Sequence, residues 1–131
     1  PRPLALPLLS PGTATMNSIT PAQLQDWLQQ AADPAAPGVL PVVLDVREPW
    51  ELQTASVTPA GFELRHIPMR SVPERLAELD RDQPIACLCH HGMRSMNVAA
   101  FLEQHGFEHL ANISGGIDAW SHEVDPAVPR Y

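Results

Sequence analysis

The sequence has little positive charge. Its 131 residues include 8 Lys and Arg against 15 Asp and Glu, which gives a formal net charge of -7. Nucleic-acid affinity depends on clustered cations that neutralise phosphates, so this composition argues against a nucleic-acid partner. Any anion that the protein binds must therefore be held by a local arrangement of donors rather than by a broad basic surface.

Long apolar runs and a disulfide framework are also lacking. No run approaches the ~20 apolar residues that span a bilayer, and the charged-then-apolar pattern of a secretory signal is absent from the sequence. We therefore expect no membrane partner and a cytoplasmic location. The two cysteines, Cys87 and Cys89, lie two positions apart in an apolar segment. This spacing is poor for a disulfide on a strand, so we expect reduced thiols.

The length and an apolar fraction of 44% suit one compact domain with a buried core. Residues 1–15 are rich in proline and small residues and show no periodicity. We expect a disordered N-terminal extension over these residues and a single domain over residues 16–131.

Apolar patterning predicts strands that alternate with helices. Near-continuous apolar runs predict buried strands at 39–46, 84–89 and 109–113, with a weaker candidate at 62–68. Helices are predicted at 20–31, from Pro49 onward, at 71–79, at 96–106 and at 115–121. This alternation implies right-handed crossovers, and hence an α/β fold with a parallel sheet covered by helices on both faces.

The segment CLCHHGMRS, residues 87–95, joins a predicted central strand to the next helix. Ligands of open parallel sheets collect beyond the carboxyl ends of the strands, which is where Cys89 falls. Gly92 permits a tight bend with inward-pointing N–H groups, and the helix that begins near Ser95 adds its own donors and dipole. These features favour a thiolate, and Arg94 can hydrogen-bond an oxyanion. The segment therefore predicts a cysteine that attacks or carries a negatively charged group.

Other interpretations of this segment exist. Cys89 taken alone is most simply a small buried apolar side chain, and Cys87, on the same side of the strand, is expected in the core. A metal site formed by both cysteines with His90 and His91 is disfavoured, because ligands crowded along one strand end cannot easily converge on a tetrahedral ion. We expect no metal and no cofactor. Either histidine could carry positive charge near a bound anion.

Two further charged residues follow another central strand. The segment LDVRE places Asp45 and Arg47 on the same rim as Cys89 if the strands are parallel. They can pair with each other, or with Glu48 and Glu51, to fix the loop, or they can form a charged wall of the pocket. Both interpretations stay open at this point.

Three segments together resemble a known family. LDVREPWE, CHHGMRS and ISGGIDAW occur in the order and spacing of the single-domain rhodaneses, the thiosulfate sulfurtransferase family, over about residues 17–122. The resemblance implies a five-stranded parallel sheet flanked by helices. It also implies a cysteine that takes sulfane sulfur from thiosulfate, or from a persulfide donor, to become a persulfide. The sulfur then passes to cyanide or to a thiol, including the thiol of a protein acceptor.

The resemblance also assigns roles to residues. It makes Cys89 the nucleophile and persulfide carrier, Arg94 the contact to the substrate anion, and Asp45 and Arg47 supports of the site. The backbone N–H groups of the loop would cradle the terminal sulfur. This cradle comprises His90, His91, Gly92, Met93, Arg94 and Ser95.

The chain departs from the family pattern in one strand-end segment. Of the Gly-His-Ile-Pro-Gly-Ala pattern of relatives only His66, Ile67 and Pro68 remain, and Met69 and Arg70 replace small residues. The family pattern therefore does not predict how this segment forms the neighbouring wall of the pocket.

Two other functions are considered. The first is a relay module that holds the persulfide for a protein partner and has little activity with free thiosulfate. The second is an arsenate reductase or phosphatase. The second is disfavoured, because phosphatases of this architecture have a loop one residue longer between the cysteine and the arginine.

Overall fold

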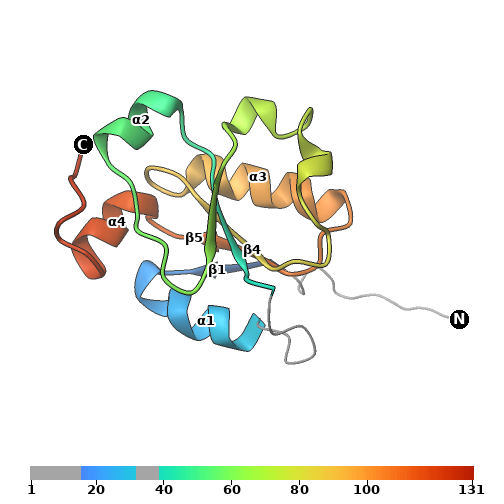
Figure 1. Cartoon of the computed structure of the whole chain (residues 1–131), viewed down its shortest axis with the longest axis horizontal. Helices are drawn as coiled ribbons and strands as arrows, with labels where there is room; N and C mark the ends of the chain where they lie inside the picture. Colours follow the sequence, from blue (N-terminus) through green and yellow to red (C-terminus); the bar gives the residue numbers. More distant parts are fainter. Residues whose placement is uncertain (1–15, 32–38) are drawn as a thin grey trace, which may run out of the picture.

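The computed structural model describes residues 16–31 and 39–131 (Figure 1). The extension predicted for residues 1–15 lies outside the described residues. Five strands form one sheet in the order β1-β5-β4-β2-β3, and every neighbouring pair is parallel. The strands are β1 (Met16–Ile19), β2 (Val42–Asp45), β3 (Glu63–His66), β4 (Ile85–Leu88) and β5 (Leu110–Ile113).

Helices cover both faces of this sheet. They are α1 (Leu24–Ala31), α2 (Pro49–Thr54), α3 (Met93–Gln104) and α4 (Gly116–Glu123). Figure 1 shows α1 and α4 on one side of the sheet and α3 on the other. The predicted α/β fold with a five-stranded parallel sheet is therefore confirmed. No helix within the described residues has the length and apolar character needed to cross a membrane.

The core has two parts because successive strand residues point to opposite faces. On the α1 and α4 side, Val43 and Leu88 pack with Trp120. On the α3 side, Leu44 and Cys87 pack with residues of that helix. Strands β2, β4 and β5 are buried along their whole length. This double coverage explains why these strands have near-continuous apolar runs rather than alternating ones.

One strand was not predicted. Strand β1 carries the exposed Asn17 and Ser18, so it has no apolar run that would predict a strand. It lies at the edge of the sheet and pairs only with β5, from Met16 opposite Leu110 to Ile19 opposite Ile113. Its strand conformation thus depends on a partner about a hundred positions away in the chain.

The helix predicted at 71–79 is wrong. The chain forms two short 3-10 segments there, Met69–Ser71 and Leu76–Glu78, joined by turns. Pro73 has no N–H with which to extend a helix through this region, and most of the hydrogen bonds span three residues, as from Leu79 N to Leu76 O.

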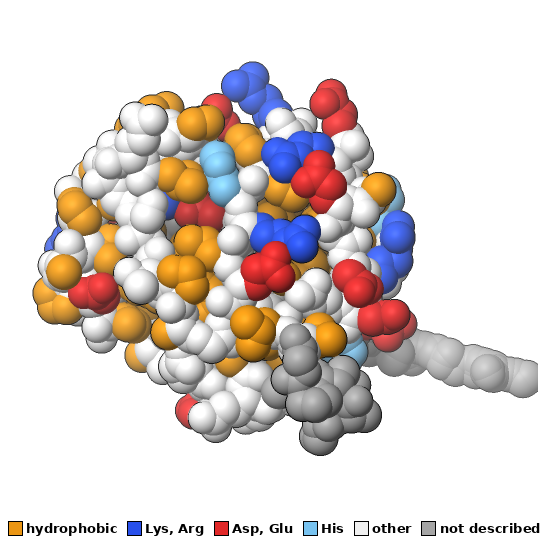
Figure 2. Space-filling model, viewed as in Figure 1, with side chains coloured by type: hydrophobic (Ala, Val, Ile, Leu, Met, Phe, Trp, Pro, Cys, Tyr) orange, Lys and Arg blue, Asp and Glu red, His pale blue; other side chains and the backbone are white. Residues whose placement is uncertain are grey.

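Arginines and acidic side chains lie next to each other on the face seen in Figure 2. The ion pairs Arg65–Glu63 and Arg75–Glu78 are examples, and all four of their side chains are more than a third exposed. Such exposed pairs contribute little to stability. In each pair, however, the acidic side chain occupies a guanidinium group that could otherwise bind an anion.

The fold brings the ends of β2 and β4 together. Asp45, the last residue of β2, lies opposite Leu88, the last residue of β4, and Val46 donates its N–H to Leu88 O. Arg47 and Cys89 therefore follow neighbouring strands at the same edge of the sheet, as the sequence predicted.

Candidate active site

Cys89 directly follows β4 and is 1% exposed. The N–H of Gly92 donates a hydrogen bond to its Sγ at 3.0 Å, and Ser95 Oγ lies 3.3 Å from the same sulfur. The loop therefore folds around the sulfur, although the side chain is almost fully buried. Donors aimed at sulfur stabilise its negatively charged form.

Gly92 makes the bend that allows this arrangement. Its φ of +105° lies in the left-handed region, and it caps helix α3, which begins at Met93. A Cβ at this position would lie 3.0 Å from the backbone nitrogen of Gly115. The first N–H groups of α3 have no carbonyl acceptor inside the helix, and they begin at this loop. The site thus combines a bend that suits glycine with the positive end of a helix dipole.

Ser95 and Asn112 form a buried, hydrogen-bonded pair next to the Cys89 sulfur. Ser95 Oγ lies 2.5 Å from Asn112 Oδ1, and Asn112 Nδ2 donates to Gly92 O at 3.3 Å. A hydroxyl has one proton, so Ser95 donates either to Asn112 or to the Cys89 sulfur. The hydroxyl can therefore accept from a thiol while it donates to Asn112, and can turn its proton to the sulfur of a thiolate.

The start of α4 holds the loop from the other side. Ile117 N–H donates to Cys89 O at 2.8 Å, and Asp118 N–H donates to His90 O at 3.1 Å. A Cβ at Gly116 would lie 2.3 Å from Cys89 O. The Gly-Gly turn of the sequence is therefore a point of close backbone approach that fixes the cysteine loop.

Asp45 and Arg47 pair with each other. Arg47 Nη2 lies 2.7 Å from Asp45 Oδ2, and the two side chains are 0% and 1% exposed. The same nitrogen donates to Ala55 O at 2.8 Å, after helix α2. Of the two interpretations left open by the sequence, the geometry favours the one in which this pair fixes the chain around the site.

Arg94 is engaged by Glu51. The guanidinium donates two hydrogen bonds to the carboxylate, at 2.7 and 2.8 Å. Glu51 is 4% exposed and Arg94 is 32% exposed at the side chain. The hydrogen bonds from Arg94 hold the pKa of Glu51 at about 2. Because a guanidinium has five N–H donors, three remain after this pairing for another acceptor.

The histidines of the loop form part of a stack of rings. The His90 ring lies 3.9 Å from the ring of His91 and 3.8 Å from that of Tyr131, almost parallel to the latter. Burial, and then the neighbouring His91, lower the pKa of His90. This favours a neutral imidazole next to Cys89. Met93, also predicted in the cradle, has a side chain that is 76% exposed.

Three contributing residues were missed by the sequence analysis as parts of the site. Asn112 could have been noticed as a polar residue within an apolar buried strand, since such a residue needs a partner. Glu51 was considered only as a partner for Asp45 and Arg47. Tyr131 gave no local signal.

No group of three or more His, Cys, Asp and Glu side chains in residues 16–31 and 39–131 is arranged to hold a metal ion. Cys87 is fully buried within the core on the α3 side. Burial, together with the nearby Cys89, raises the pKa of the Cys87 thiol to about 12. This thiol is therefore protonated under ordinary conditions, as expected of core packing.

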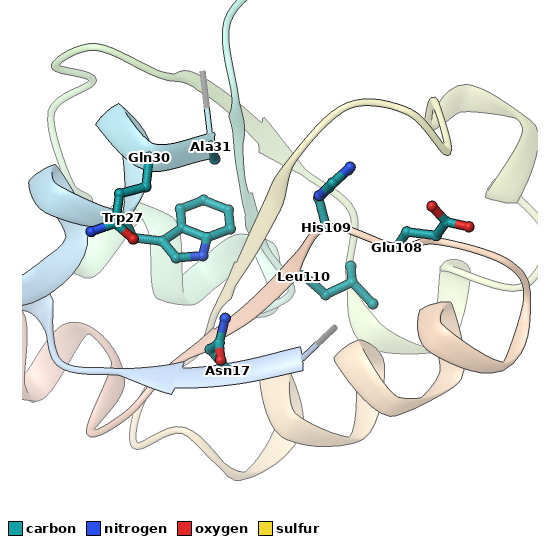
Figure 3. A pocket seen from close by; sticks show the side chains of 7 residues that line it. All are labelled: Asn17, Trp27, Gln30, Ala31, Glu108, His109 and Leu110. Atoms are coloured by element: carbon teal, nitrogen blue, oxygen red, sulfur yellow. The ribbon is translucent and has the colours of Figure 1, made fainter. Parts of the chain in front are cut away.

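A separate pocket of about 340 Å³ lies at another part of the sheet (Figure 3). Leu110, which begins β5, lines it, whereas Cys89 follows the end of β4. Because the strands are parallel, the pocket lies at the amino ends of the strands and the cysteine loop lies at their carboxyl ends. Its lining residues are Asn17, Trp27, Gln30, Ala31, Glu108, His109 and Leu110.

The fold and the cysteine loop define a class: an α/β protein whose parallel sheet presents a cysteine loop at its carboxyl edge, against the start of a helix. A family model described as Rhodanese-like domain matches residues 20–123. The chain belongs to the rhodanese-like family, which confirms the resemblance seen in the sequence.

Individual relatives agree with this assignment. The chain is 31% identical over 81 residues to the thiosulfate sulfurtransferase GlpE of Stutzerimonas stutzeri, covering 62% of this chain and 71% of that protein. It is 40% identical over 93 residues, 68% of its length, to Rhodanese-like/PpiC domain-containing protein 12, chloroplastic, of Arabidopsis thaliana, but spans only 30% of that protein. A solved structure of a rhodanese-related protein from Thermoplasma volcanium matches with a TM-score of 0.66 at 32% identity, covering 88% of this chain and 99% of that one.

Proposed function

We propose that this protein is a sulfurtransferase that takes sulfane sulfur from thiosulfate onto Cys89 and passes it to a thiol or to cyanide. The observation that carries the proposal is the contact of Gly92 N–H and Ser95 Oγ with the Cys89 sulfur, at the start of α3. A loop of this kind stabilises negative charge on sulfur both before and after transfer. Membership of a family that includes thiosulfate sulfurtransferases supports the assignment.

The reaction has two displacement steps. In the first, the Cys89 thiolate attacks the outer sulfur of thiosulfate, a new S–S bond forms, and sulfite leaves with the electron pair of the old one. In the second, cyanide or a thiolate attacks the outer sulfur of the persulfide, and the Cys89 thiolate is the leaving group. No external oxidant or reductant is needed.

The charged groups of the site suit an anionic donor. Two N–H groups of Arg94 are held by Glu51, which fixes the plane of the guanidinium. The three others are the donors that we assign to the oxygens of thiosulfate. The mechanism also requires Cys89 to stay free, and neither cysteine is in a disulfide. We therefore propose a reducing compartment, the cytoplasm, as the location.

The test compares the two cysteines of β4 and its loop. With thiosulfate and cyanide, the wild-type protein should form thiocyanate and Cys89→Ser should form it only at the background rate. Cys87→Ala is the matched control, because Cys87 is buried in the core; it should retain turnover per folded molecule. Equal thiocyanate formation by Cys89→Ser and wild type would show that the proposal is wrong.

The relay function is a second candidate, favoured by exposed apolar side chains next to the site. Met93, the first residue of α3, is 76% exposed, and Trp50, in α2, is 61% exposed. Such side chains suit contact with a protein surface. Mass spectrometry after incubation with a persulfide donor separates the candidates. A stable extra sulfur on Cys89 without thiocyanate turnover supports the relay, and an unmodified thiol contradicts both.

A further inference from the structure

Tyr131 contacts one end of the cysteine loop directly and the other through Glu51, although it lies far from that loop in the sequence. Its ring is stacked on His90, the residue after Cys89, with 3.8 Å between ring centroids and 5° between planes. Its hydroxyl contacts Glu51, which holds Arg94 at the other end of the loop. Figure 1 shows the last described residues of the chain beside α2. The Tyr131 side chain thus contacts both helix α2, at Glu51, and the cysteine loop, at His90.

The direction of the hydrogen bonds through this hydroxyl is fixed. Arg47 Nη1 lies 2.9 Å from Tyr131 Oη, and a guanidinium can only donate, so the tyrosine oxygen accepts. The phenol proton then goes to Glu51 Oε1, at 2.9 Å. Burial raises the pKa of Tyr131, so this proton is retained across the ordinary pH range. The result is an ordered chain from Arg47 through Tyr131 and Glu51 to Arg94.

Four hydrogen bonds hold the Glu51 carboxylate. Oxygen Oε1 accepts from Tyr131 and from Arg94 Nη2, and Oε2 accepts from Arg94 Nη1 and from Glu48 N. A carboxylate held in this way sets the plane of the guanidinium that it binds. The orientation of the remaining N–H donors of Arg94 therefore depends on Tyr131.

We propose that Tyr131 is a positioning residue of the active site, which acts through Glu51 on Arg94 and through its ring on the loop at His90. Its role in catalysis rests on the sulfurtransferase function proposed above. The hydroxyl and the ring make separable contributions: Tyr131→Phe removes only the first, and Tyr131→Ala removes both.

The test measures how well the site accepts an anion at Cys89, independently of sulfur transfer. Iodoacetate and iodoacetamide both alkylate a thiolate, which displaces iodide and forms a C–S bond, but only iodoacetate carries a negative charge. The ratio of the two rate constants measures how strongly the donors around the sulfur favour the anionic reagent over the neutral one. Unfolded molecules are alkylated by both reagents without these donors, so the ratio is measured under conditions in which each variant is folded, as checked by circular dichroism.

We expect Tyr131→Phe to lower the iodoacetate to iodoacetamide ratio about three- to tenfold, the size of effect that loss of one ordinary hydrogen bond produces. Tyr131→Ala should lower it further. Arg130→Ala is the matched control, because Arg130 ties the same segment to Asp118 through an exposed ion pair. This control should leave the ratio unchanged.

A double-mutant cycle tests the route through Glu51. In a Glu51→Gln background, Tyr131→Phe should change the ratio little further. An unchanged ratio in Tyr131→Phe, an equal loss in Arg130→Ala, or full additivity with Glu51→Gln would each overturn the proposal. If the ratio responds as expected but the wild-type protein forms no thiocyanate, the positioning role stands and the sulfurtransferase function is wrong.

Discussion

Cys87 and Cys89 lie on one strand and its following loop, on the same side of the sheet, yet the surroundings of their sulfur atoms differ. Both side chains are within 1% of full burial. Cys89 accepts a hydrogen bond from the Gly92 N–H, and its sulfur lies 3.3 Å from the Ser95 hydroxyl oxygen. Cys87 lies among apolar side chains, which raise the pKa of its thiol to about 12. At this scale, polar contacts rather than exposure distinguish the thiol that we propose as the nucleophile from the thiol of the core.

Glu51 provides a residue-scale prediction about pH. Its pKa is lowered from the usual 4.5 to about 2, chiefly by Arg94. A lowered folded-state pKa contributes stability that is present above pH 4.5 and is lost as the pH falls toward 2. Glu51→Gln should therefore flatten the dependence of the unfolding free energy on pH in this window. At pH 7 the variant should be less stable by about 1–3 kcal/mol.

Urea unfolding at several pH values from 7 to the acid limit of the folded state checks this prediction. Glu78→Gln is the control, because Glu78 pairs with Arg75 at the surface and its side chain is 48% exposed. This control should change stability little. Identical pH slopes for Glu51→Gln and wild type would contradict the assigned role of the Glu51–Arg94 pair.

The start of helix α4 acts as a brace for the cysteine loop at the scale of elements. Its first N–H groups donate to the carbonyls of Cys89 and His90. The two glycines before and at its start have positive φ values, 77° at Gly115 and 59° at Gly116. Two elements that are separate in sequence are therefore joined by two backbone hydrogen bonds.

Gly116→Ala tests this brace. The new Cβ would lie 2.3 Å from Cys89 O and 2.5 Å from His90 O, so the loop must move. We expect lower stability and a loss of thiocyanate turnover per folded molecule. Gly61→Ala is the matched control: its φ is +80°, but its Cβ would meet nothing nearer than 3.8 Å.

Both variants place alanine at positive φ, which costs about 1–2 kcal/mol. Only Gly116→Ala should also reduce turnover. Thermal unfolding measured together with the thiocyanate assay separates the two effects. Equal activity losses at both positions would show that the contact with the loop has no functional role.

At the scale of the whole molecule, one sheet separates two cores. Leu28 of α1 belongs to the core on one face, and Leu102 of α3 belongs to the core on the other. They are 5% and 0% exposed. Because both cores pack on the same strands, loss of one core exposes the sheet that supports the other. We therefore expect the described domain to unfold as one unit.

Leu28→Ala and Leu102→Ala should each lower the unfolding free energy by about 2–4 kcal/mol, since each leaves a cavity beside the sheet. Denaturant unfolding followed by two independent probes should give one coincident transition in both variants. Leu40→Ala is the matched control, because Leu40 is 49% exposed; its effect should be about 0.5 kcal/mol or less. Separate transitions for the two probes would contradict cooperative unfolding.

The sequence alone determined the features that depend on neighbouring positions. The apolar runs at 39–46, 84–89 and 109–113 predicted the central strands, because full burial on both faces requires near-continuous apolar character. The strand-to-helix switch at Gly92 placed Cys89 at the carboxyl edge of the sheet. The Thr20 and Gln23 spacing marked a helix start, and Thr20 N–H does donate to Gln23 Oε1.

Only the tertiary structure decided which distant groups meet around the sulfur. The Arg94–Glu51 pair spans 43 positions, and the Tyr131–Glu51 hydrogen bond spans 80. Strand β1 likewise exists through its pairing with β5. Such contacts depend on strand order and on the crossovers that bring carboxyl ends together, whereas periodicity and capping report only on positions a few residues apart. The proposed nucleophile could thus be located from the sequence, and the distant residues that surround it could not.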